Sequence, residues 1–261
     1  MRGRARAAIV PTKSVLTALL LALAAGANAF ADDRSACAEL GRPVDERLAA
    51  CDRAIGSGAV VGGPLATLYS FRALTHFSRQ DYARALADLD AAITLEPARA
   101  DSFTQRGILY TRMGDLAAAR ADFDTVLRLD PRNPQHWTNR AFVHVRLGRY
   151  DEAVADYGEA IQRSPATAFA HAGRGAAYRL KGDLDPALAD LDRALSLDPR
   201  LARAYFHRAL VFEARGDPDR ALADLRRSVE LDGRDTEAQE ALARLDKGAT
   251  TSQGSEPRSE P

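Results

Sequence analysis

Two cysteines and five histidines are the side chains best suited to metal or redox chemistry in this chain. A metal ion needs three or four such ligands close together. His136 and His144 are the closest pair of histidines, and on one helix they would lie two turns apart. The remaining histidines are His76, His171 and His207. The sequence therefore predicts packing or surface roles for the histidines, no metal site and no cofactor.

Sequence patterns of known catalytic chemistry are also missing. The chain has no Gly-x-Ser-x-Gly, no glycine-rich phosphate loop and no paired-cysteine metal motif. Its carboxylates mostly recur at repeated positions, which is typical of a scaffold and not of one tuned acid–base pair. We expect no catalytic residues and no enzymatic activity.

An export signal is predicted over residues 1–31. Four basic residues precede an uncharged stretch over residues 14–31, and Ala27-Asn28-Ala29 and Ala29-Phe30-Ala31 are small-x-small sites suited to a signal peptidase. Cleavage after Ala31 is preferred, with Ala29 as the second possibility. The apolar core is short for a membrane span. A retained N-terminal anchor helix stays as the alternative.

Cys37 and Cys51 follow this signal. An exported protein enters an oxidising compartment, where an even number of cysteines favours a disulfide. Arg42-Pro43 between them would let two short helices fold back on each other. Two buried free thiols are the alternative. Lipidation of Cys37 is less favoured, because the apolar stretch ends several residues earlier.

The net charge of the chain excludes some classes of binding partner. The chain carries 36 basic and 36 acidic residues, so removing the four basic residues of the signal takes the net charge from 0 to −4. A mildly acidic protein is not expected to bind nucleic acid or an anionic membrane surface.

The strongest pattern is an internal repeat. Pro97, Pro131, Pro165 and Pro199 follow one another at intervals of 34 residues. With each proline at position 32 the repeats are 66–99, 100–133, 134–167, 168–201 and 202–235; the last has Gly233 in place of proline.

Other columns agree with this register. Position 8 is always Ala or Gly, position 20 is always Ala, and position 24 is always Leu, Phe or Tyr. Position 15 is Gly in four repeats and Gln80 in the first, and position 16 is Asp in four repeats. Glycine ends a helix and Asp begins one. Each repeat is therefore predicted to be helix A, a tight turn and helix B, and five such hairpins must stack to bury their apolar faces.

The pattern resembles the tetratricopeptide repeat (TPR) family over residues 66–235. The resemblance implies an all-α fold, a right-handed α-solenoid of helix-turn-helix hairpins, in an exported bacterial protein. Around the array we expect a degenerate N-terminal hairpin over residues 32–65, with a Gly-rich link over 56–63, a capping helix over 236–247 and a disordered tail over 248–261.

Position 7 is arginine and position 23 is aspartate in every repeat. We predict a ladder of structural pairs between helices A and B. A charged stripe for partner binding is the alternative. The predicted pairs are Arg72–Asp88, Arg106–Asp122, Arg140–Asp156, Arg174–Asp190 and Arg208–Asp224.

The resemblance also implies that helix A lines a concave groove that binds a partner. Lysine and asparagine at positions 5 and 9, used by relatives that hold a C-terminal carboxylate, are missing here. Aromatic and basic residues instead predict a partner protein or peptide with apolar and acidic residues. The expected partner-binding residues are Phe71, Phe77, Gln105, Arg112, Asn139, Phe142, Arg146, Phe169, Arg179, Arg203 and Phe206. Packing of these phenylalanines against neighbouring repeats is the alternative.

The predicted function is a non-catalytic scaffold or adaptor, periplasmic or secreted, with no membrane span once the signal is removed. Two other classes stay open: an envelope enzyme or its accessory subunit, and a self-assembling structural protein.

Overall fold

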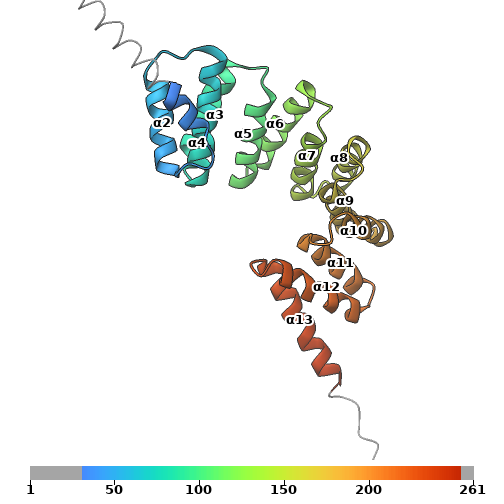
Figure 1. Cartoon of the computed structure of the whole chain (residues 1–261). Coiled ribbons are helices and arrows are strands. Elements are labelled where there is room, and N and C mark those ends of the chain that lie inside the picture. Colours follow the sequence, from blue (N-terminus) through green and yellow to red (C-terminus); the bar gives the residue numbers. More distant parts are fainter. Residues whose placement is uncertain (1–30, 254–261) are drawn as a thin grey trace, which may run out of the picture. The chain divides into compact units, whose positions relative to one another are not determined.

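The structure is a computed structural model that describes the backbone of residues 31–253 and the side chains of residues 31–247. The predicted signal peptide lies outside the described residues except for Ala31. The chain divides into two compact units, residues 1–105 and 106–261, which are described separately. Every regular element between residues 31 and 253 is a helix (Figure 1).

The first compact unit contains a helical stretch over residues 31–38 and three longer helices. The disulfide Cys37–Cys51 joins this stretch to α2, and both cysteines are fully buried. The predicted disulfide is confirmed. α2 packs on α3, and α3 pairs with α4. The helices are α2 (Val44–Gly56), α3 (Gly62–Ser78), α4 (Tyr82–Leu95) and the first residues of α5 (Ala100–Met113).

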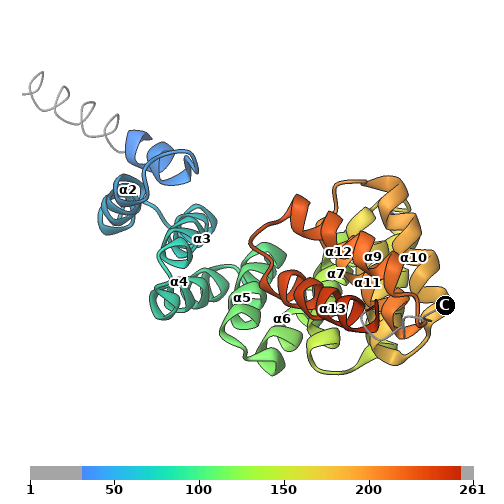
Figure 2. The same cartoon turned by 90° about the horizontal axis from the view of Figure 1, so that it is seen from below.

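The second compact unit holds the rest of α5 and eight further helices. Consecutive helices pair as α7 with α8, α9 with α10 and α11 with α12 (Figure 1). α13 packs on α12 (Figure 2). α9 also contacts α7 and α11, so these A helices are neighbours. The helices are α6 (Leu116–Leu129), α7 (Pro134–Arg146), α8 (Tyr150–Arg163), α9 (Ala168–Lys181), α10 (Leu184–Leu197), α11 (Ala202–Ala214), α12 (Pro218–Leu231) and α13 (Thr236–Gln253).

The turns inside the hairpins follow the chemistry of their residues. The four glycines at position 15 all have positive φ, and Gln80 takes the same left-handed conformation at φ 61°. Asp81, Asp115 and Asp217 each accept a hydrogen bond from a backbone N–H of the following helix. Asp183 was expected to do the same but does not, and its carboxylate lies 3.1 Å from Nζ of Lys181.

Small residues let the paired helices approach closely. The alanines at positions 8 and 20 are buried, and so are the large residues at position 24. A methyl group at Gly107 would lie 2.9 Å from the Phe123 ring, and one at Gly175 would lie 2.8 Å from Leu191. Alanine would therefore overpack both sites.

Two boundaries differ from expectation. α3 begins at Gly62, so the end of the predicted Gly-rich link is helical. α13 runs to Gln253, so residues 248–253 of the predicted disordered tail are helical too. Once a helix has formed, each added residue costs little, and Pro257 is the first later residue that cannot continue one. Residues 254–261 lie outside the described part. None of the described helices has both the length and the apolar character needed to cross a bilayer.

Candidate functional site

The arginines at position 7 and the aspartates at position 23 form five ion pairs with one geometry. In each pair Nε and Nη2 of the arginine donate to the two carboxylate oxygens, over 2.7 to 2.9 Å. The aspartate side chains are only 6 to 10% exposed. Hydrogen bonds to Asp156 raise the pKa of Arg140 despite its partial burial. The paired donors are therefore used inside each hairpin and are not offered to a partner.

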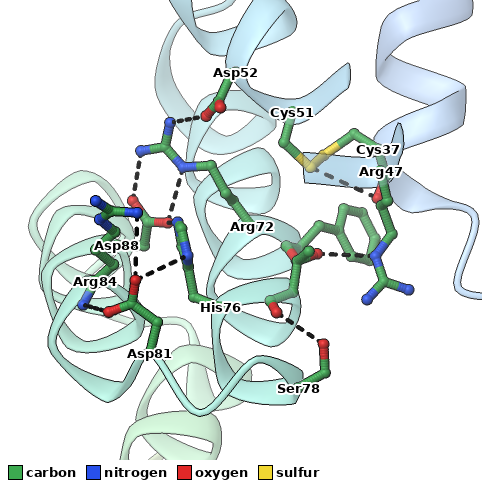
Figure 3. Close-up of polar contacts among 12 residues, drawn as sticks. Cys37, Arg47, Cys51, Asp52, Arg72, His76, Ser78, Asp81, Arg84 and Asp88 are labelled. Carbon is green, nitrogen blue, oxygen red and sulfur yellow. Dashed lines mark hydrogen bonds and ion pairs between the residues drawn. A yellow bond between two sulfur atoms is a disulfide. The ribbon is translucent and has the colours of Figure 1, made fainter. Parts of the chain in front are cut away.

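A second carboxylate binds the remaining Nη1 of several of these arginines. Arg140 donates to Asp124 of the preceding B helix over 2.8 Å, and Arg208 donates to Asp192 over 2.7 Å. Arg72 lies between Asp52 and Asp88 in the same way (Figure 3). Each of these arginines thus links three helices. This contact was not predicted from the sequence, although aspartate recurs at position 25 of the repeat as Asp90, Asp124 and Asp192.

Arg174 differs from this pattern because Gly158 occupies the equivalent place on α8. A methyl group at Gly158 would lie 3.8 Å from Nη1 of Arg174. The neighbouring Gly173 makes room for the Tyr157 ring, which would lie 2.4 Å from an added methyl group. α8 and α9 thus meet through glycines and an aromatic ring.

Side chains at position 4 of the repeat contact a carbonyl of the preceding loop, which was not predicted from the sequence. Nε1 of Trp137 donates to the Pro131 carbonyl over 2.9 Å, and the Tyr205 hydroxyl donates to the Pro199 carbonyl over 3.4 Å. Nε2 of His171 lies 3.1 Å from the Pro165 carbonyl. These side chains tie the start of helix A to the loop before it. The detectable signal was a hydrogen-bonding ring six residues after Pro131, Pro165 and Pro199; Phe103, six residues after Pro97, has no such group.

The other histidines lie among carboxylates and apolar residues. His76 and His144 are buried, and each has Nε2 within 4 Å of an aspartate of the ladder, at 3.9 Å from Asp88 and 3.6 Å from Asp156. Burial lowers the pKa of His144. His136 is buried with Nε2 3.4 Å from Asp130. No group of three potential ligands within the described residues could hold a metal ion.

The structure places some of the predicted partner-binding residues on the surface and leaves others half-buried. Phe142 is 50% exposed and Phe169 is 66% exposed, on the neighbouring helices α7 and α9. Arg112, Arg146 and Arg203 are exposed as well. The half-buried members are Phe71, Phe77, Gln105, Asn139 and Arg179.

The structure corrects the prediction that Phe206 binds a partner. Its side chain is only 7% exposed and packs in a cluster with Leu225, Ala238 and Ala241. The capping helix α13 covers this last A helix, as the alanines from α13 in the cluster show. Phe206 therefore belongs to the core and offers no surface to a partner.

Three basic side chains lie close together where α9 and α11 meet. Burial and the positive charges of Arg179 and Arg203 lower the pKa of His207 to about 3. Nη1 of Arg203 donates to Asp235 and Glu237, each over 3.1 Å. Nε of Arg179 and Nδ1 of His207 are buried without a hydrogen-bond partner.

A cavity of about 530 Å³ lies in the first compact unit, between the helical stretch 31–38 and α3. Its walls are mostly apolar, with Leu68, Phe71 and Pro64 on one side and Arg34 on the other. Of the predicted binding residues only Phe71 lines it.

Models of the TPR family match the chain almost continuously across these hairpins. Two described as tetratricopeptide repeat match residues 73–135 and 123–155, one described as TPR repeat matches 143–182 and 175–216, and a further tetratricopeptide repeat model matches 202–245. The chain belongs to the TPR family. A search of curated proteins finds no match.

Solved TPR structures resemble this TPR protein in fold. One, described as YrrB, a TPR protein with an unusual peptide-binding site, is 23% identical over 67% of this chain and 91% of its own, with a TM-score of 0.53. TTC0263, a thermophilic TPR protein in Thermus thermophilus, is 20% identical over 69% and 98%, with a TM-score of 0.59. A tetratricopeptide repeat protein from Parabacteroides merdae is 22% identical over 77% of both chains, with a TM-score of 0.62. These matches confirm the all-α solenoid class.

Proposed function

We propose that this TPR protein is a non-catalytic scaffold or adaptor that binds a segment of another protein. The site is the A-helix face, which we define as Phe142 and Arg146 of α7, Phe169 and Arg179 of α9, and Arg203 of α11. The observation that carries the proposal is the exposure of Phe142 and Phe169 on the neighbouring helices α7 and α9, which also carry Arg146 and Arg179. Exposed aromatic rings beside arginine are the composition of interface hot spots.

The chemistry of this face suggests the kind of segment it binds. Phe142 and Phe169 offer apolar surface, and Arg146 is an exposed cation, whereas the charge of Arg203 is already paired with Asp235 and Glu237. A segment that combines apolar and acidic residues matches both features. Nucleic acid and anionic membrane surfaces fit less well, because the chain without residues 1–31 has a net charge of −4.

We further propose that the protein acts in the periplasm or outside the cell, after cleavage of residues 1–31. The buried disulfide supports this location, because such bonds persist in oxidising compartments and are rare in the cytosol.

The function is tested by affinity capture from cell-envelope extracts with the chain from residue 32. We expect a stoichiometric protein partner whose capture falls at least about 10-fold in a Phe142→Ala/Phe169→Ala variant, since two hot-spot side chains are removed. Leu129→Ala is the control, because this leucine is 39% exposed at the end of a B helix. Equal capture by the double variant and the wild-type protein would overturn the proposal. Turnover of a small substrate by the isolated chain would favour an enzyme, and concentration-dependent oligomers in light scattering would favour self-assembly.

A further inference from the structure

Arg179 is unusual among the arginines of the A helices. The five position-7 arginines each hold a buried aspartate, whereas Arg179 makes no hydrogen bond or ion pair with any described residue. Its side chain is partly exposed, but its Nε is buried. Burial lowers the pKa of this guanidinium, and the charge of Arg203 lowers it further. A partly buried cation without a counter-charge destabilises the fold, so a protein that keeps one needs another reason for it.

His207 faces the same place from α11. Its Nδ1 is buried and has no partner, and its neighbouring charges are Arg179 on α9, Arg203 on α11 and Asp235 before α13. Tyr150, at the start of α8, is close enough to affect Arg179, and Glu237 of α13 is bound to Arg203. The two carboxylates of this neighbourhood are therefore engaged by Arg203, and neither one hydrogen-bonds to Arg179.

We infer that Arg179, with His207 beside it, binds a carboxylate of the partner segment. The guanidinium offers a planar pair of donors, which suits a carboxylate held through both oxygens. An incoming anion would also relieve the mutual repulsion of Arg179 and Arg203. This inference rests on the proposed function, because it assigns one acidic group of the partner to a place on the A-helix face.

The anion site can be tested without the partner. We expect acetate, titrated against chloride at equal ionic strength into the chain from residue 32, to shift the ring resonances of His207 saturably in NMR spectra. The titration is made at neutral pH, where acetate is ionised. This response should vanish in Arg179→Gln and persist in Arg193→Gln, a substitution of an exposed arginine on α10. A His207 ring that responds equally in acetate and chloride would overturn the inference.

Peptide probes identify the source of the carboxylate. Two peptides with acetylated and amidated ends are compared, both containing phenylalanine and either one glutamate or one glutamine. The glutamate peptide should bind at least 10-fold more tightly. Arg179→Gln should abolish that difference. A neutral peptide with a free C-terminus shows whether a terminal carboxylate serves equally well. Equal binding of the glutamate and glutamine peptides would contradict the inference, while their shared dependence on Phe142 and Phe169 would leave the proposed function standing.

Stability separates this role from a structural one. Arg179→Gln removes an uncompensated cation, so we expect its Tm to equal or exceed that of the wild-type protein. A lowered Tm together with unchanged discrimination between the peptides would show that Arg179 serves the fold instead.

Discussion

Nε and Nη2 of Arg140 donate to the two oxygens of Asp156 over 2.8 and 2.7 Å, and the aspartate side chain is only 7% exposed. Arg140→Met keeps an unbranched apolar side chain but leaves this carboxylate without its counter-charge. We expect a loss of about 3 kcal/mol in the free energy of unfolding, measured by urea denaturation.

The double variant Arg140→Met/Asp156→Leu is the control for that loss. Replacing both members of a buried pair by apolar residues is far less costly than removing one, so most of the stability should return. Unchanged stability of Arg140→Met combined with weaker partner binding would contradict the structural interpretation and favour a charged binding stripe.

Gly158→Asp should add the ion pair that α8 lacks. Its carboxylate would reach Nη1 of Arg174, as Asp124 and Asp192 reach Arg140 and Arg208. The equivalent aspartates are about half exposed, so the pair should contribute about 0.5 kcal/mol. Gly158→Asn separates this effect from the gain in helix propensity. The advantage of Asp over Asn should shrink in 1 M salt, and equal stability of both variants at low salt would disprove the pair.

Gln80→Gly should stabilise the first hairpin. Gln80 has φ 61°, a conformation that costs a residue with a Cβ about 1 kcal/mol and costs glycine almost nothing. The reverse substitution, Gly182→Gln, should lose a similar amount at the equivalent turn, where φ is 94°. Chemical denaturation of both variants measures the change. A destabilising Gln80→Gly would mean that the glutamine side chain contributes more than its backbone costs.

The disulfide should hold the helical stretch 31–38 in place. Its Cys37 is fully buried against α2, and an eight-residue helix is too short to persist alone. Cys37→Ser/Cys51→Ser should cost about 3 kcal/mol locally and abolish the slow hydrogen exchange of residues 31–38. Exchange in the second compact unit is the internal reference and should not change. Full protection of residues 31–38 in the double variant would contradict this role.

His207 should make the fold sensitive to acid. Its pKa is lowered to about 3 by burial and by Arg179 and Arg203, against about 6.5 in the unfolded chain. Above pH 6.5 the imidazole is neutral in both states and adds no pH dependence. As pH falls from about 6.5 towards 3, the imidazole of His207 becomes protonated in the unfolded state but stays neutral in the folded state. The free energy of unfolding should therefore decrease, by at most about 1.4 kcal/mol per pH unit. His207→Asn should flatten this slope in urea titrations between pH 7 and 4, and an identical slope would refute the assignment.

Most of the fold could be predicted from the sequence because the repeat fixes both helices of each hairpin in one register. The prolines, the glycines and the small residues at positions 8 and 20 act locally, so their effects could be inferred without a three-dimensional structure. The missed features depend on distance between elements. The contact between Arg140 and Asp124 joins two hairpins, and the burial of Phe206 depends on α13 covering the end of the array.

The binding site was less predictable for the same reason. Family positions identify which residues lie on helix A but not which of them a neighbour covers. Phe169, at position 2 of its repeat, and Phe206, at position 5 of the next, were both expected in the groove, yet one is 66% exposed and the other 7%. Arg179 showed no distinguishing feature in the sequence, because its lack of a partner appears only when all nearby carboxylates are placed.

Arg140 and Arg208 each bind one aspartate 16 residues ahead and another 16 residues behind. These contacts are defined by an interval along the chain and do not depend on absolute position. Removing or duplicating a whole 34-residue period would keep every arginine in register with the aspartate ahead and with position 25 of the preceding hairpin, where Gly158 is the exception in the second compact unit. Any other length would break this register. A change of array length by whole periods is therefore compatible with these contacts, whereas a shift of a few residues inside a hairpin would break them.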